Sequence, residues 1–111
     1  MQRFSRAWNQ GDVTKIADEF TNDAIRIVSN PSSPIMGQEP IKEVFKETFS
    51  DENEFKDSHI EVKVIETRSV SDEIYLGAGY FKILNQQNEI IEQGKWGSVF
   101  ELNDGKIKFL M

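Results

Sequence analysis

Apolar residues in the first half of the chain recur every three or four positions, which is the spacing of one face of a helix. Gly11 ends the first such stretch, Asp12 can cap the second, and Pro40 suits the first turn of the third. The pattern predicts three amphipathic helices, over about 4–10, 13–20 and 37–49.

The rest of the chain favours strands. Residues 24–28 indicate a short strand, and residues 29–34, which include two prolines, indicate a loop. From residue 58 onward the apolar period changes to two, which predicts strands at about 58–70, 74–85, 89–103 and 106–111. Three-residue loops at 71–73 and 86–88 and the Asp104-Gly105 turn join them as hairpins.

Successive hairpins make an antiparallel sheet, and the helices must pack on one of its faces. Four glycines in strand interiors allow strong bending of that sheet, namely Gly77, Gly79, Gly94 and Gly97. The expected fold class is therefore α+β, a curved antiparallel sheet closed by three N-terminal helices. At 111 residues the chain suits one domain, over 1–111.

The turn lengths decide which side chains share a face, because partners across a hairpin point the same way. With these lengths one face becomes apolar, and we expect it to meet the helices. If either three-residue loop were one residue longer or shorter, the inward and outward side chains of every strand beyond it would be exchanged. This inner face should hold Ile60, Val62, Val64, Ile74, Leu76, Ala78, Tyr80, Ile90, Trp96, Ser98, Phe100, Leu102, Ile107 and Phe109.

The outer face mixes charged residues with large apolar ones, whereas a face that meets only water is usually polar. Its polar members should be His59, Glu61, Lys63, Gln93, Lys95 and Glu101. Its apolar members should be Tyr75, Phe81, Ile83, Ile91 and Val99. We therefore predict a homodimer through this face, with Tyr75, Phe81, Ile83 and Val99 in the interface.

Composition and charge limit the classes of function. A formal charge of −6 argues against nonspecific binding to nucleic acid or to an anionic membrane. No stretch approaches the roughly 20 apolar residues of a membrane span. The absence of cysteine excludes disulfides and thiolate chemistry. The first ten residues have no apolar core of signal-peptide type, so we expect a cytoplasmic location.

Five short sequences, in this order and spacing, suggest a family. They are Trp8-Asn9-Gln10-Gly11-Asp12, Phe20-Thr21-Asn22-Asp23-Ala24, Gly37-Gln38-Glu39-Pro40-Ile41, Gly94-Lys95-Trp96 and Asn103-Asp104-Gly105-Lys106. Together they resemble the nuclear-transport-factor-two-like superfamily, particularly its SnoaL-like and ketosteroid-isomerase-like branches. The resemblance spans nearly the whole chain. It implies a cystatin-like fold, a cone-shaped roll whose open end binds small molecules.

The resemblance does not bring the isomerase chemistry with it. Ketosteroid isomerases use an Asp base and an oxyanion hole made by a Tyr and a protonated Asp. At the matching positions this chain has Asn30, Phe4 and Ser98, none of which can play those roles. We therefore expect no isomerase reaction of that kind.

Other catalytic sets are also missing from the sequence. SnoaL-like cyclases and related dehydratases depend on an Asp or a His–Asp pair in the pocket, whereas the one histidine, His59, is expected on the outer face. No cluster of His, Asp, Glu or Cys suggests a metal site, and no glycine-rich motif suggests a phosphate cofactor. We expect neither a metal nor a cofactor.

The residues expected to line the pocket are few. Arg26 and Glu92 are the sharpest candidates, because a charge on an inner face is costly unless it is paired or functional. Either could also reach water at the end of its strand. Aromatic residues could line the cavity or fill it as core. The full set is Trp8, Arg26, Asn30, Tyr80, Glu92, Trp96, Ser98 and Phe100.

The sequence leaves two alternative functions open. The first, which we favour, is a noncatalytic module that binds a small apolar or amphipathic molecule or supports assembly, as association domains of calcium/calmodulin-dependent kinases do in this superfamily. The second is a SnoaL-like isomerase, cyclase or dehydratase acting on a small hydrophobic carbonyl compound. In that enzyme, Glu92 or Tyr80 would supply the acid–base group.

Overall fold

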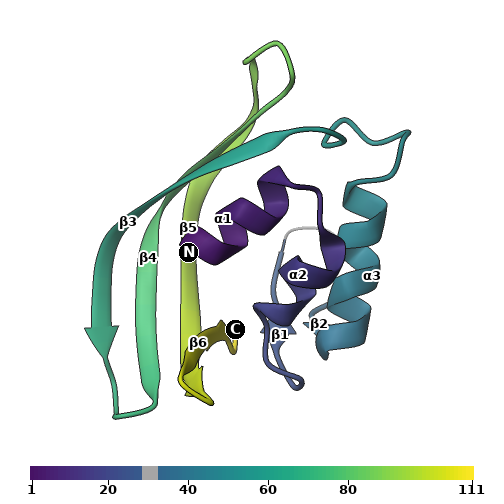
Figure 1. Cartoon of the computed structure of the whole chain (residues 1–111). Coiled ribbons are helices and arrows are strands. Elements are labelled where there is room, and N and C mark those ends of the chain that lie inside the picture. Colours follow the sequence, from purple (N-terminus) through teal and green to yellow (C-terminus); the bar gives the residue numbers. More distant parts are fainter. Residues whose placement is uncertain (29–32) are drawn as a thin grey trace.

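The computed structural model describes residues 1–28 and 33–111. Three helices and two very short strands precede four longer strands, as the sequence predicts apart from one strand (Figure 1). In chain order they are α1 (Gln2–Asn9), α2 (Val13–Asp18), β1 (Ile25–Arg26), β2 (Ile35–Met36), α3 (Gln38–Thr48), β3 (His59–Ser69), β4 (Ile74–Leu84), β5 (Ile90–Asn103) and β6 (Lys106–Phe109). Strand β2, which pairs with β1, was not predicted.

The four long strands form one antiparallel sheet in the order β3-β4-β5-β6. The three hairpin connections have the predicted lengths. Val70 bonds to Ile74 across the first loop, and Asn85 bonds to Glu89 across the second. In the last turn Asp104 and Gly105 both have positive φ, at 50° and 77°, as a two-residue type I′ turn requires.

Two β-bulges break the alternation within the strands. The pairing of β3 with β4 skips Ile65, and the pairing of β5 with β4 skips Ile91. Each bulge adds one residue to a strand and so reverses the facing of the strand opposite. β4 lies between the two bulged strands, so its inward and outward side chains are exchanged relative to the prediction. The inner residues predicted for β3 and for most of β5 still share one face.

The faces of β4 are therefore the reverse of the prediction. Its inner side carries Tyr75, Gly77, Gly79, Phe81 and Ile83, and its outer side carries Ile74, Leu76, Ala78 and Tyr80. The second bulge also exchanges two isoleucines of β5. Ile90 is exposed and Ile91 packs on the core, contrary to their predicted sides. On β3 and the rest of β5 the predicted inner residues do face inward.

Helices α2 and α3 begin where the sequence indicates, and α1 begins about two residues earlier than predicted. The Asp12 side chain accepts a hydrogen bond from the Lys15 backbone N–H at 3.1 Å and caps α2. Gly37 precedes α3 with φ at 96°, a backbone conformation that favours glycine. The Gln38 side chain donates to the carbonyl oxygens of Ala17 and Phe20, which holds α3 against the end of α2. These contacts fix the helical layer.

Aromatic rings fill the space between the helices and the sheet. Phe4, Phe20 and Phe45 from the helical half meet one another, and Phe4 and Phe20 also meet Phe109 of β6, at centroid distances of 4.9–6.4 Å. The Phe109 backbone N–H donates to the Glu19 carbonyl oxygen, and the Phe109 carbonyl oxygen accepts from the Thr21 N–H. These two hydrogen bonds connect the end of the sheet to the helical layer. Figure 1 shows the sheet curving around α1, with α2 and α3 beyond it.

No helix in residues 1–28 and 33–111 is long and apolar enough to cross a membrane.

Candidate functional site

Two aromatic side chains of β5 form the inner wall of the sheet. Trp96 and Phe100 are half-buried, and their rings meet edge to face with centroids 6.4 Å apart. Both rings lie against Gly77 of β4, where an added Cβ would come 2.9 Å from Phe100 Cε2. The Trp96 indole N–H donates to the Tyr80 carbonyl oxygen at 3.2 Å. Glycine on β4 thus makes room for an aromatic lining supplied by β5.

Arg26, on β1, packs on an aromatic ring of the helical layer. Strand β1 places its guanidinium carbon 4.6 Å from the ring centroid of Phe45, a cation–π geometry. The side chain is half-buried, and that burial lowers the pKa of the Arg26 guanidinium. The negative charge of Glu92 partly opposes this shift in pKa. Arg26 and Glu92, the sharpest candidates in the sequence, therefore lie within electrostatic reach of each other.

The two charged residues differ in their surroundings. Glu92 lies on the inner face of β5, opposite Ile83, but its side chain is exposed. No hydrogen bond or ion pair joins the Arg26 guanidinium to another side chain in the described ranges. Ser98 shares the inner face of β5 with Trp96 and is half-buried. The arrangement offers one partly desolvated cation above the Phe45 ring.

Trp8 belongs to the core and does not line an opening. Its ring is buried against Phe45, Phe49 and Phe55 at centroid distances of 4.8–6.4 Å. Its indole N–H donates to Ser58 Oγ at 3.1 Å. Of the two interpretations that the sequence left open for this tryptophan, the structure supports core packing. Phe45 lies in the third predicted helix and was not among the predicted pocket residues, yet its ring contacts Arg26.

Two other predicted pocket residues lie elsewhere. Tyr80 is on the outer face and is 54% exposed, because the bulge at Ile65 turns β4 over. The prediction that it lines the inner pocket was therefore wrong. Asn30 lies outside the described residues.

The predicted interface residues need the same correction. Phe81 and Ile83 face the core, and Tyr75 lies on their side of β4. Among the four, Val99 is the one on the outer face, next to Leu76. A homodimer through the outer face would therefore use other residues than those predicted.

No site for a metal ion is evident in the part of the chain that the structure describes. No three side chains of His, Cys, Asp or Glu gather there. His59 lies on the outer face, as predicted, with its Nε2 atom 3.8 Å from Glu61 Oε2.

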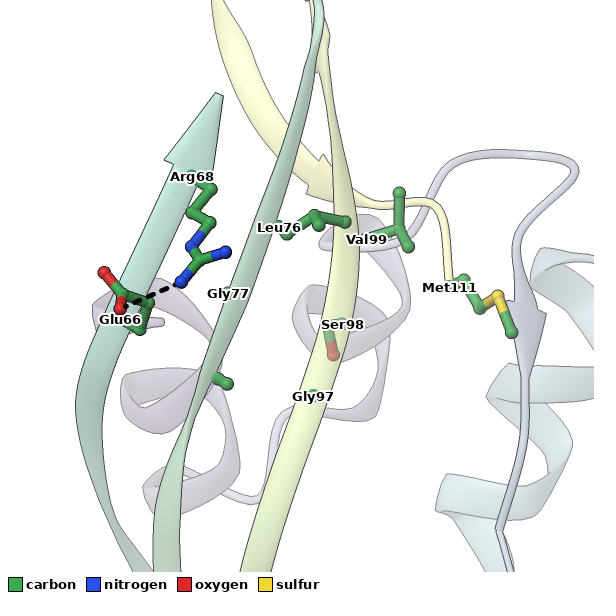
Figure 2. A pocket seen from close by; sticks show the side chains of 9 residues that line it. Glu66, Arg68, Leu76, Gly77, Gly97, Ser98, Val99 and Met111 are labelled. Atoms are coloured by element: carbon green, nitrogen blue, oxygen red, sulfur yellow. Dashed lines mark ion pairs between the residues drawn. The ribbon is translucent and has the colours of Figure 1, made fainter. Parts of the chain in front are cut away.

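The outer face carries two grooves. The first, of about 420 Å³, is centred on small residues, Ala78 and Gly97, with Leu76 and Val99 beside them. Figure 2 looks onto this groove, with the helices behind the sheet and the Glu66–Arg68 ion pair at one edge. The second, of about 600 Å³, surrounds Tyr80 and includes three lysines, Lys63, Lys82 and Lys95.

Comparisons with known proteins rest on structure alone, since the sequence matches no family model and no curated protein. An NTF-2-like protein of unknown function from Shewanella oneidensis superposes with a TM-score of 0.82 at 14% identity, over 99% of this chain and 88% of that one. The chain has an NTF2-like fold. The fold class predicted from the sequence, and the fold that the resemblance implies, are thereby confirmed.

Other structural neighbours carry different descriptions. A putative calcium/calmodulin dependent protein kinase II association domain from Xanthomonas campestris has a TM-score of 0.79 at 18% identity, covering 98% of this chain and 76% of that one. A ketosteroid isomerase-like protein from Erwinia carotovora atroseptica has a TM-score of 0.70 at 11% identity, over 98% and 84%. At these identities the likeness shows the NTF2-like fold, and function must be argued from the site.

Proposed function

We propose that this NTF2-like domain binds a small amphipathic molecule inside its cone, with Arg26 holding an anionic head group. The observation that carries this proposal is the half-buried Arg26 guanidinium on the Phe45 ring. Its positive charge is partly removed from water, and no ion pair with another described side chain compensates it. A bound carboxylate would supply that compensation.

The chemistry of the guanidinium favours a planar anion. Arginine presents two parallel N–H groups to a carboxylate, and such charge-assisted hydrogen bonds strengthen when water is excluded. Phe45 supplies the aromatic ring under the guanidinium, and Trp96 and Phe100 line the inner side of the sheet. Ligand sites of this kind combine an apolar lining with a few placed polar groups. The ligand class is therefore a carboxylate with an apolar tail or ring.

An enzyme of the SnoaL-like group is the alternative, because one structural neighbour is described as ketosteroid isomerase-like. It would need an acid–base residue beside the substrate. Glu92 is exposed, and Tyr80 lies on the opposite face of the sheet. General acids and bases usually work in sites that exclude water, whereas both of these side chains are exposed. These positions favour binding over catalysis.

Calorimetry with sodium decanoate and with decanol tests the binding function. We expect the wild-type protein to bind decanoate, and decanol more weakly. Arg26→Gln should weaken decanoate binding by about 10- to 100-fold, the effect of losing a charged hydrogen-bond partner. Arg68→Gln, a matched change on the exposed outer face, should leave it unaltered. Equal affinity of wild type and Arg26→Gln for decanoate would contradict the proposal.

The cytoplasmic location expected from the sequence stays a prediction. Fractionation of expressing cells, followed by immunoblotting, would test it.

A further inference from the structure

Strand β5 has an open edge on the side away from β4. The strand contains 14 residues, but β6 pairs with only the last four of them. Val99 also exchanges backbone hydrogen bonds with Met111. Figure 1 shows β6 beside the lower end of β5 alone. The edge from Gln93 to Gly97 is therefore unpaired in the part of the chain that the structure describes.

Three residues of this edge, Gln93, Lys95 and Gly97, direct their backbone N–H and C=O groups away from β4. Alternate residues of a strand form their hydrogen bonds on the same side, and Val99, the next in this series, bonds on the β6 side. All three residues are exposed, and no backbone hydrogen bond satisfies their edge groups within residues 1–28 and 33–111. The edge thus offers three donors and three acceptors, about 6.8 Å apart along the strand.

The opposite edge of the sheet, along β3, is better protected against a further strand. A bulge at Ile65 interrupts it, and its outward residues alternate between acidic and basic side chains. Bulges and charges are the usual protection of sheet edges. In contrast, the stretch from Gln93 to Gly97 pairs regularly with β4 and holds one charged residue, Lys95. A new strand therefore fits best along β5.

Lys95 also determines which charge a new strand should carry. Its cross-strand partner Tyr80 pairs in turn with Lys63, and Lys82 follows Tyr80 on the same face of β4. These three lysines surround the second groove, in which Glu61 is the one acidic residue. Neither Lys63 nor Lys95 forms an ion pair with another described side chain. Opposite charges on neighbouring strands stabilise their pairing, so the outward side chains of a partner should be acidic.

From the open edge and these charges, we infer that β5 binds an extended peptide segment of another protein as a fifth strand of the sheet. The segment runs antiparallel to β5 and carries acidic residues at its outward positions. An acidic residue opposite Lys95 exchanges two backbone hydrogen bonds with it and brings its carboxylate to the ammonium group. The alternate residues point inward beside Trp96 and Ser98, which favours apolar side chains there. Main-chain bonds give such a complex its affinity, and the side-chain pattern gives its selectivity.

Hydrogen exchange of the free protein, measured by NMR, tests whether the edge is open. The backbone amides of Gln93, Lys95 and Gly97 should exchange at least about 100-fold faster than those of Trp96 and Ser98, which point toward β4. Slow exchange at all three edge amides would overturn the inference. It would mean that the edge is already paired, for instance with a second copy of the chain.

The peptide acetyl-Val-Glu-Val-Glu-Val-Glu-Val-amide tests strand addition directly. We expect it to slow exchange at the three edge amides. N-methylation of its glutamates removes the donors that face β5 and should weaken binding by about tenfold or more. N-methylation of its valines, whose donors face away from β5, is the matched control and should leave the affinity unchanged. Equal effects of the two methylations, or no protection by the unmodified peptide, would overturn the inference.

A charge reversal tests the role of Lys95. Lys95→Glu should weaken binding of the glutamate peptide by about tenfold or more and should favour a peptide with lysine in place of glutamate. Lys15→Glu makes the same charge change on an exposed residue of α2 and should bind like the wild type. Arg26→Gln should also bind the peptide normally, because the edge is separate from the proposed ligand site. A wild type that bound both peptides equally would contradict the assigned chemistry of the partner.

Discussion

Ser58 is a buried polar residue at the start of the sheet, and it serves two neighbours at once. Its Oγ atom accepts the Trp8 indole N–H at 3.1 Å and donates to the Phe55 carbonyl oxygen at 2.6 Å. Both of its hydrogen-bonding roles are therefore filled inside the core. The side chain fixes the orientation of the largest ring in that core.

Ser58→Ala should destabilise the protein by about 1–3 kcal/mol, because the buried indole N–H would lose its acceptor. Urea denaturation followed by tryptophan fluorescence measures this change. Ser50→Ala is the control at an exposed serine and should leave the unfolding midpoint within error. Equal midpoints for the two variants would show that the Trp8–Ser58 bond contributes nothing.

The role of Trp8 could not be read from the sequence for a clear reason. Its helical spacing showed that it faces inward, but the acceptor that orients it is Ser58, 50 residues away. Arg26 was found more easily, because a charge among inward-facing apolar residues is conspicuous at sequence level. Its contact with Phe45 depends on how β1 packs against α3, which no local pattern records.

Strand β4 shows which features of a strand the sequence predicts and which it does not. Both three-residue loops and the final turn have the predicted lengths, so the hairpins themselves were predictable. The facing of β4 was not, because the bulges occur at Ile65 and Ile91, which are ordinary strand residues. Both sides of β4 are also rich in apolar residues, so hydrophobicity could not reveal the reversal.

Gly79→Ala should be strongly destabilising at this point in β4. An added Cβ would lie 1.8 Å from the Lys63 carbonyl oxygen, beside the Ile65 bulge, and backbone cannot yield there as a flexible side chain can. We expect a loss of several kcal/mol or failure to fold. Gly97→Ala is the matched control in the adjacent strand, with its nearest atom 4.0 Å away. Denaturation at submicromolar concentration compares them; similar midpoints would contradict the proposed clash.

Across the whole molecule, the sheet separates the proposed ligand site from the face through which the sequence predicts a homodimer. Arg26 and the Phe45 ring lie on the side of the helices, and the outward residues of β3 and β4, such as Glu61 and Leu76, lie on the opposite side. The sheet between them is held by its own hydrogen bonds and is anchored to the helical layer around Phe109. Changes on one side should therefore have little effect on the other.

A double dissociation checks this independence. Arg26→Gln should lose decanoate binding and keep the predicted dimer, whereas Leu76→Arg, which puts a charge on the exposed outer face, should weaken the dimer and keep decanoate binding. Calorimetry and sedimentation on the same preparations give both results. If either variant lost both properties while remaining folded, the ligand site and the dimer would be coupled across the sheet.

Each of the two bulges is a self-contained insertion of one residue. Val64 faces inward and Glu66 outward on either side of Ile65, and Ile90 faces outward and Glu92 inward on either side of Ile91. Deleting Ile65 or Ile91 would therefore join two residues that already alternate, and it would leave a regular ladder without turning any strand over. In a lineage of such sheets, either insertion could be gained or lost without the other.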